Sequence, residues 1–272
     1  MLPEPDSLFH AELERVNFSE TGIQPPQKPA LDALPHLLHY GGFPEPFLKA
    51  DKRFSTRWKR LRGEQLVRED IRDLTRIQEI GQLEMLMDAL VSQAGQLVNY
   101  STLAGRINTS VDTIRRWLKA LQSFYFCFEV RPWSRNVAKS LRKQPKVYLW
   151  DWSLVSEAGG ARYENLVASH LLKSVHWWTD RGLGNFGLYF LRDKVGREVD
   201  FLVVKDNMPW FLVEAKTSSA RDIHPALAHF QHQTGARHAF QVVFQLPYVA
   251  RNCFEVGAPV IVPAATFLSQ LV

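Results

Sequence analysis

The spacing of apolar residues divides the chain into a helical first part and a mixed second part. Before residue 124, apolar side chains recur at helical intervals, as at Leu83, Leu86, Met87 and Leu90. After it, short runs rich in Val, Phe and Leu predict strands at residues 124–130, 146–150, 187–191, 198–204, 210–215 and 238–244. Helical patterns are present at residues 161–175 and 223–233. From residue 161 onwards, the helices and strands therefore follow the order αβββαβ. Several strands are apolar on both faces, so we expect helices on both sides of the sheet.

Two of the predicted strands, residues 197–204 and 210–216, flank the polar segment 205–209 and predict a β-hairpin. If the hairpin is symmetric about Asn207, Asp200 lies opposite Glu214, and Lys216 points to the same face. Buried charges are tolerated when they are paired or bind a metal, so this cluster predicts a site. Two alternatives stay open. A slip of one residue separates the two acids, and a charge pair at a hairpin end needs no further role.

Residues 97–123 have the pattern of a helix-turn-helix. Ser101 or Thr102 can cap a first helix that ends near Ile107, and residues 108–110 supply a turn and the next cap. The second helix is expected to bury Val111, Ile114, Leu118 and Leu121. Its other face carries Arg115, Lys119 and Gln122, where a recognition helix meets a major groove.

The connection between the next two predicted strands is basic and contains no acid. Its basic residues are Arg131, Arg135, Lys139, Arg142, Lys143 and Lys146. A helix-turn-helix followed by a hairpin is a winged helix, and a basic wing suits the phosphate backbone of double-stranded DNA. We expect Arg115, Lys119, Arg135, Lys139, Arg142 and Lys143 to contact it. A protein–protein adaptor is the alternative, because winged helices serve both purposes.

Composition adds limited information about partners and location. The net charge of +5 and the isoelectric point near 9.2 mildly favour a polyanionic partner. The two cysteines, Cys127 and Cys253, lie among apolar residues, which predicts buried free thiols. No apolar run is long enough for a membrane helix, and the N-terminus lacks a secretory signal pattern, so we expect a cytoplasmic protein without membrane contact.

The first 75 residues suggest a linker followed by helices. Residues 1–30 are weakly patterned and rich in proline, and the breaker cluster at residues 41–46 interrupts the helical pattern that follows. Residues 49–62 hold seven basic side chains against the single acid Asp51, which indicates either a solvated helix face or a phosphate-binding surface. We therefore expect a multi-domain protein of the α+β or α/β class. Its parts are a linker and helical segment (1–75), a winged helix (76–150) and an αβββαβ domain (151–272).

Five short motifs, taken in order, resemble a known protein family. They are Tyr40-Gly41-Gly42-Phe43-Pro44-Glu45, Lys146-Val147-Tyr148-Leu149-Trp150-Asp151, Tyr163-Glu164-Asn165-Leu166-Val167, Gly196-Arg197-Glu198-Val199-Asp200-Phe201 and Val213-Glu214-Ala215-Lys216. They resemble the C-terminal half of prokaryotic AAA-type ATPases, whose tail is a domain of unknown function (DUF4143). The placement of Asp200 and Glu214-Ala215-Lys216 within αβββαβ is similar to the PD-(D/E)XK nuclease superfamily, which implies a restriction-endonuclease-like fold.

One large part of that ATPase family has no counterpart in the sequence. The chain contains no Gly-x-x-x-x-Gly-Lys-Ser/Thr loop, so we do not expect it to hydrolyse ATP alone. Residues 31–75 then resemble what remains of the ATPase lid. The chain is either a shortened gene product or the partner of a separate ATPase subunit.

The nuclease resemblance implies a metal-dependent site. Asp200 and Glu214 would bind Mg²⁺, or Mn²⁺, with the Ala215 carbonyl as a third ligand, while Lys216 positions water or stabilises charge. Glu164 matches a helical acid that some members use, or is a surface acid near a helix start. Glu198 is a further ligand or a strand-edge ion pair. Two functions follow: a DNA-cleaving enzyme, or a non-catalytic DNA-binding or docking module of an ATPase.

Overall fold

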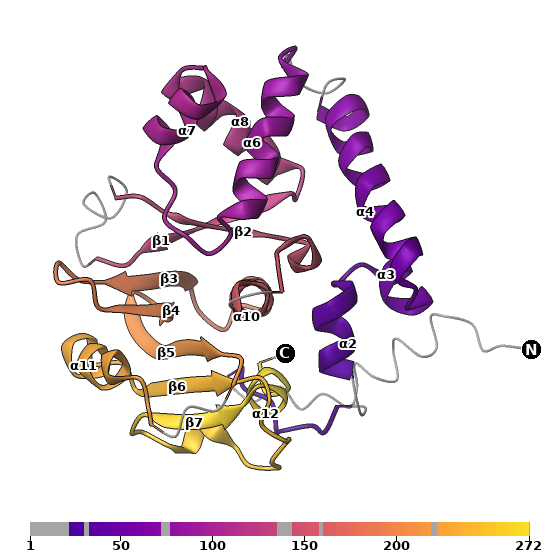
Figure 1. The fold of residues 1–272 in the computed structure, drawn as a ribbon. Helices are drawn as coiled ribbons and strands as arrows, with labels where there is room; N and C mark the ends of the chain where they lie inside the picture. The colour runs from indigo at the N-terminus through magenta and orange to yellow at the C-terminus, as the bar shows by residue number, and fades with distance from the viewer. Residues whose placement is uncertain are drawn as a thin grey trace, which may run out of the picture.

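The protein is a mixed α/β molecule built around one twisted sheet (Figure 1). The computed structural model describes residues 22–29, 33–71, 77–134, 143–157, 160–218 and 222–271. Within these ranges the sheet has seven strands in the order β2-β1-β3-β4-β5-β6-β7. The strands are β1 (Cys127–Pro132), β2 (Lys146–Leu149), β3 (Phe186–Arg192), β4 (Glu198–Lys205), β5 (Met208–Lys216), β6 (His238–Val243) and β7 (Val260–Pro263).

The helices pack at the ends and on both faces of this sheet. They are α2 (Ala33–Tyr40), α3 (Pro44–Lys49), α4 (Lys52–Gln65) with the π-helical turn η1 (Leu66–Ile71), α6 (Ile80–Ser92), α7 (Tyr100–Ile107), α8 (Val111–Ser123), α10 (Ala161–Asp180), α11 (Pro225–Thr234) and α12 (Ala264–Leu268). Short 3₁₀ turns occupy Trp152–Leu154 (η2) and Cys253–Glu255 (η4). The predicted order αβββαβ is confirmed by α10, β3, β4, β5, α11 and β6. The pattern did not predict β7 and α12.

Apolar side chains on both faces of the central strands pack the helices against the sheet. On one face Phe201 and Phe211 belong to a core with α10 and α12. On the other, Leu202 and Leu212 pack with Leu227 of α11. The expectation that helices cover both sides is therefore confirmed.

The sheet is continuous across the boundary expected near residue 150. Strands β1 and β2 are antiparallel to each other, and β1 then pairs in parallel with β3 through Arg131–Tyr189 and Pro132–Phe190. Helices α6, α7 and α8 pack against this end of the sheet through a separate apolar core that includes Cys127 and Val147. The strands of the segment expected as a winged helix thus belong to the same sheet as the strands of the αβββαβ part.

The two helices α7 and α8 are joined by a short turn. Asn108 ends α7 in the left-handed conformation, with φ of 57°, and the Ser110 hydroxyl caps α8 at Thr113, as expected. The cap of α7 differs from the expectation: Asn99 accepts hydrogen bonds from the amides of Ser101 and Thr102. Asn is as good a cap as Ser, and its place before Tyr100 starts the helix two residues earlier.

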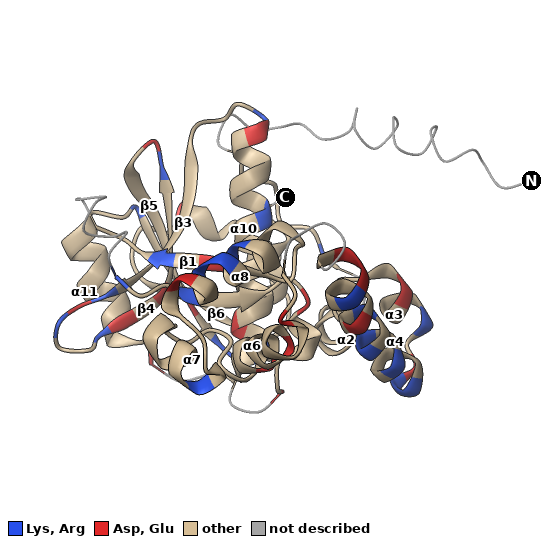
Figure 2. Cartoon of the chain, turned by 90° about the horizontal axis from the view of Figure 1, so that it is seen from above, with Lys and Arg blue, Asp and Glu red and all other residues tan. Residues whose placement is uncertain are grey.

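Basic side chains are concentrated on two helices outside the sheet. Figure 2 shows Lys and Arg along α4 and on α8. In the basic segment 49–62, Asp51 caps α4, and Lys59 turns inward to donate to the Ser153 carbonyl at 3.0 Å. Both cysteines are buried and free, as expected. No helix in the described ranges is long and apolar enough to cross a bilayer.

Candidate functional site

The register of the β4–β5 hairpin decides whether Asp200 and Glu214 share a face. Asp206 and Asn207 form a two-residue turn, with φ of 49° and 65°, so the loop is shorter than the sequence suggested. From the turn, Lys205 pairs with Met208 and Val204 with Pro209. If that pairing continued unbroken, Asp200 would face Val213, and Glu214 would point to the other side of the sheet.

A β-bulge at Trp210 corrects this register. Val203 pairs with Phe211 instead of Trp210, so β5 gains one residue, and Phe201 then faces Val213. The next residues along, Asp200 and Glu214, therefore lie opposite each other, as the sequence predicted. Pro209 lacks an amide hydrogen and fits beside such an irregularity. The Trp210 ring packs on Trp178 of α10 at 5.2 Å between centroids, which anchors the bulge.

Asp200 itself lies in a second irregularity, on the other edge of β4. Tyr189 pairs with Leu202 but Leu191 pairs with Val199, so Asp200 and Phe201 together oppose Phe190. Bulges of this kind re-aim side chains. Both Asp200 oxygens are engaged: Oδ2 accepts the Ala215 amide at 2.9 Å, and Oδ1 lies 3.8 Å from Lys146 Nζ.

Glu214 joins the cluster from the neighbouring strand and is only 4% exposed. Its Oε2 accepts the Asp200 amide at 3.4 Å, and its Oε1 accepts Lys216 Nζ at 2.7 Å. His224, just before α11, brings Nδ1 to 4.0 Å from the same Oε1. Strand and helix periodicity did not bring this histidine to the cluster, because its contact crosses from another element.

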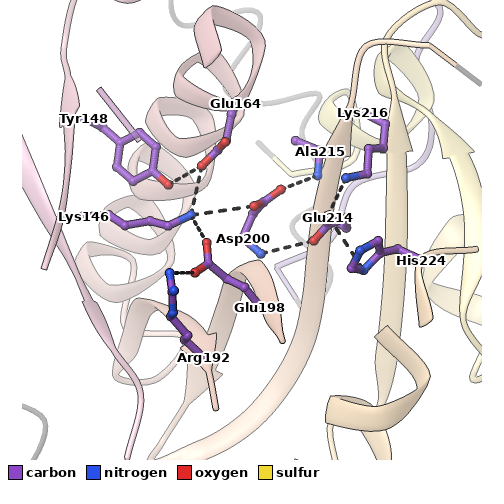
Figure 3. Close-up of polar contacts among 10 residues, drawn as sticks. All are labelled: Lys146, Tyr148, Glu164, Arg192, Glu198, Asp200, Glu214, Ala215, Lys216 and His224. Carbon is purple, nitrogen blue, oxygen red and sulfur yellow. Dashed lines mark hydrogen bonds and ion pairs between the residues drawn. The ribbon is translucent and has the colours of Figure 1, made fainter. Parts of the chain in front are cut away.

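Glu164 approaches the same place from the first turn of α10 (Figure 3). Its Oε1 accepts the Tyr148 hydroxyl at 2.7 Å and Lys146 Nζ at 3.3 Å. It is therefore not a freely solvated surface acid. Glu198, at the start of β4, also faces the cluster, where Oε2 pairs with Arg192 at 3.0 Å.

Lys146 lies among three of these acids, and one of them, Asp200, is an acid to which the resemblance assigned a metal ion. Its Nζ lies 2.7 Å from Glu198, 3.3 Å from Glu164 and 3.8 Å from Asp200 (Figure 3). The residue is only 4% exposed. Sequence analysis counted it among the basic residues of the strand connection. The sequence offered one indication that Lys146 is part of a site. It starts the strand Lys146–Leu149, which is buried throughout, and a charge in such a strand needs a partner.

The cluster carries more acid than base among the described residues. Four carboxylates, from Glu164, Glu198, Asp200 and Glu214, meet the two ammonium groups of Lys146 and Lys216, with Arg192 reaching Glu198 from the exposed side. Burial, and then the charge of Glu214, raises the pKa of Asp200 to about 6. Burial, and then the charge of Asp200, raises the pKa of Glu164 to about 7. Both carboxyl groups therefore keep their protons to a higher pH than they would in water.

The lysines respond in the opposite sense. Burial alone would lower the pKa of Lys146, but Glu164, Asp200 and Glu198 outweigh it and hold that pKa above its ordinary value. Burial is also the largest single effect on Lys216 and lowers its pKa, but the hydrogen bond and charge of Glu214 together with the charges of Asp200 and Glu164 outweigh it and hold that pKa above its ordinary value. Both side chains therefore stay charged throughout the physiological range.

As these side chains lie, the cluster does not fit Mg²⁺. No group of three or more His, Cys, Asp or Glu side chains in the described ranges is arranged to hold a metal ion. The Lys146 ammonium lies among Glu164, Glu198 and Asp200, Lys216 pairs with Glu214, and the Ala215 amide donates to Asp200. A divalent ion held jointly by Glu164, Glu198 and Asp200 would have to displace Lys146.

The structure describes three of the six residues expected to contact DNA. Arg115 and Lys119 are exposed on α8, where Arg115 pairs with Asp112 at 3.3 Å and lies over the Tyr100 ring. Lys143 is exposed just before β2. The remaining three, Arg135, Lys139 and Arg142, fall outside the described residues.

Comparison with known proteins identifies two domains, both of unknown function. Residues 31–165 match DUF8612, and residues 159–251 match DUF4143, a domain often associated with AAA ATPases. An uncharacterized protein of Mycobacterium bovis is 24% identical over 208 residues, which cover 70% of this chain and 45% of that protein. An uncharacterized protein of Mycobacterium tuberculosis gives the same values. The match thus spans less than half the length of these curated relatives, and no solved structure matches the chain.

Proposed function

We propose that this chain is a non-catalytic, DNA-associated module that works with an AAA-type ATPase. The observation that carries the proposal is the position of Lys146, whose ammonium already neutralises Glu164, Glu198 and Asp200, the last of which is one of the two acids that a metal ion would need. The order αβββαβ and the paired acids Asp200 and Glu214 support a restriction-endonuclease-like ancestry for this part. The DUF4143 match supports the link to an ATPase.

The proposed DNA contact is the exposed face of α8, used as the recognition helix of a winged helix. Its opposite face is fixed in the core by Ile114, Trp117 and Leu118, so Arg115 and Lys119 point outward from a rigid support. The two charges lie four residues apart and share one side of the helix. Backbone phosphates are the ligand that such a surface fits best.

Duplex binding tests this proposal directly. Replacing Arg115 and Lys119 together by Ala should weaken binding of a labelled duplex at low salt, because two phosphate contacts are lost. The slope of log affinity against log salt should fall by about 2. The matched control replaces Lys173 and Lys194, two exposed lysines on α10 and on the β3–β4 connection, by Ala and should bind like the unaltered chain. Unchanged affinity and slope in the Arg115/Lys119 variant would remove α8 from the DNA surface.

Metal-dependent phosphodiester cleavage is the second candidate, and one observation favours it. Among the described residues the cluster has four carboxylates against the two lysines and Arg192, so the excess acid favours additional positive charge. A plasmid-nicking assay with Mg²⁺ or Mn²⁺ separates the two functions. Our proposal expects the unaltered chain and Glu214→Ala to be equally inert. Cleavage by the unaltered chain that Glu214→Ala abolishes would establish the enzyme instead.

A further inference from the structure

The environment of Lys146 is that of a bound cation. Its ammonium contacts one oxygen each of Glu198, Glu164 and Asp200, between 2.7 and 3.8 Å away. These acids come from β4 and α10, so three separate elements, counting β2, meet at this one charge. An ammonium can donate three hydrogen bonds, and three acids surround it.

Lys146 cannot easily leave this position. The residue is almost completely buried, and the Phe190 ring lies 5.6 Å from Nζ on one side. Moving the ammonium out would leave Glu164, Glu198 and Asp200 with like charges and no buried counter-ion, which is costly in a desolvated site. The flanking strand residues Val147, Tyr148 and Leu149 are fully buried and fix the lysine backbone.

We infer that the Lys146 ammonium holds the place of a divalent cation, so that these carboxylates bind a divalent metal only when that ammonium is removed. The inference deepens the proposed non-catalytic function, on which it rests, by naming the residue that keeps metal out. The relevant oxygens are Glu164 Oε1, Glu198 Oε1 and Asp200 Oδ1. Carboxylate oxygens are the ligands that Mg²⁺ and Mn²⁺ prefer.

The Lys146→Met variant isolates the charge. Methionine keeps an unbranched chain of similar bulk, fills the buried site and removes the ammonium. The three acids then lack their counter-ion, and a divalent ion can restore the balance. Mn²⁺ is the probe, because calorimetry and electron paramagnetic resonance both report its binding without any catalytic readout.

The experiment compares four forms of the full chain. We expect the unaltered chain and the control Lys194→Met to bind Mn²⁺ weakly, and Lys146→Met to bind it at least about tenfold more tightly. Adding Glu198→Gln to Lys146→Met should abolish the gain, because it neutralises the acid closest to the lysine. Equal Mn²⁺ affinity in the unaltered chain and Lys146→Met would overturn the inference, as would a gain that Glu198→Gln leaves intact.

Two further measurements keep the inference testable if the Lys146→Met variant does not fold. Lys146→Gln is a second neutral replacement with the same expected gain. In the unaltered chain, reductive methylation of Lys146, read by peptide mass spectrometry, should stay slow when Mn²⁺ is added. Mn²⁺-dependent labelling would show displacement of the ammonium and overturn the inference. If the unaltered chain does not bind DNA but the metal experiments give the expected results, only the proposed function is contradicted. If the unaltered chain binds Mn²⁺ without cleaving DNA, only this inference is contradicted.

Discussion

At the scale of residues, the central feature is a group of acids held closer together than their charges favour. Asp200 and Glu214 meet across the hairpin, and Glu164 adds a third carboxylate from α10. The sequence predicted the first two because strand pairing follows from spacing. It could not place Lys146 among them, because that contact joins strands that are far apart in the sequence and its partners are set by how the elements pack.

The raised pKa of Glu164 should make stability depend on pH. Its folded value of about 7 lies above the ordinary 4.5, so the folded protein binds the proton more tightly than the unfolded chain does. The contribution of this group is present below about pH 4.5 and is lost as the pH rises to about 7. Relative to the unaltered chain, Glu164→Gln should therefore gain stability over this interval, by at most about 3 kcal/mol. Urea unfolding at a series of pH values measures the difference, and parallel stability curves would contradict the prediction.

At the scale of elements, the site depends on irregularities in otherwise regular strands. The hairpin was predicted from its flanking apolar runs, and the register at Asp200 and Glu214 agrees with that prediction. The agreement has an unforeseen cause, because a shorter turn and the bulge at Trp210 compensate for each other. A pattern of alternating residues does not reveal a bulge, since one extra residue changes the pairing without changing the composition.

The turn provides a test of the hairpin geometry. Asn207 has φ of 65°, a conformation that glycine adopts freely and β-branched residues avoid. Asn207→Gly should leave the free energy of unfolding unchanged or slightly higher, whereas Asn207→Val should lower it by about 1–2 kcal/mol. Chemical denaturation of both variants checks this. Equal stability of the two would show that the left-handed turn is not formed.

A buried side chain of helix α10 completes the backbone hydrogen bonding of strand β2. Because β2 is the outer strand, its backbone needs partners on the side away from β1. Asn165, fully buried, supplies them: Oδ1 accepts the Leu149 amide at 2.9 Å, and Nδ2 donates to the Leu149 carbonyl at 2.6 Å. The motif containing Asn165 was visible in the sequence, but this role was not.

Replacing Asn165 by Leu should therefore be strongly destabilising. It leaves the buried amide and carbonyl of Leu149 without these partners, and we expect a loss of about 2–4 kcal/mol in thermal or chemical unfolding. Ser169→Ala is the matched control. The Ser169 hydroxyl makes a longer hydrogen bond to the same carbonyl, 3.4 Å, so its loss should cost less than about 1 kcal/mol. Equal effects of the two changes would contradict the role assigned to Asn165.

At the scale of the whole molecule, the sheet links parts that the sequence suggested were separate domains. Helix and strand order were predictable, because each depends on local periodicity. The pairing of β1 with β3 was not, since it joins residues nearly 60 positions apart (Arg131 and Tyr189) across helix α10. Phe128, Val130 and Tyr148 belong to the same apolar core as α10 and the central strands.

A fragment of residues 151–272 tests this continuity. Without β1 and β2 it loses part of its core and exposes the edge of β3, and without Lys146 its buried acids lose their central counter-ion. We expect the fragment to unfold without a cooperative transition, or to aggregate, when followed by circular dichroism. Cooperative unfolding with the stability of the full chain would show that residue 150 is a true domain boundary.

The central claim is that Lys146 supplies the positive charge at the carboxylate cluster. A crystal structure of the unaltered chain soaked in Mn²⁺ tests it most directly, because Mn²⁺ gives an anomalous signal. The account predicts Lys146 Nζ between Glu164, Glu198 and Asp200, with no anomalous peak at that position. A Mn²⁺ peak among Glu164, Glu198 and Asp200, with the lysine turned away, would contradict it.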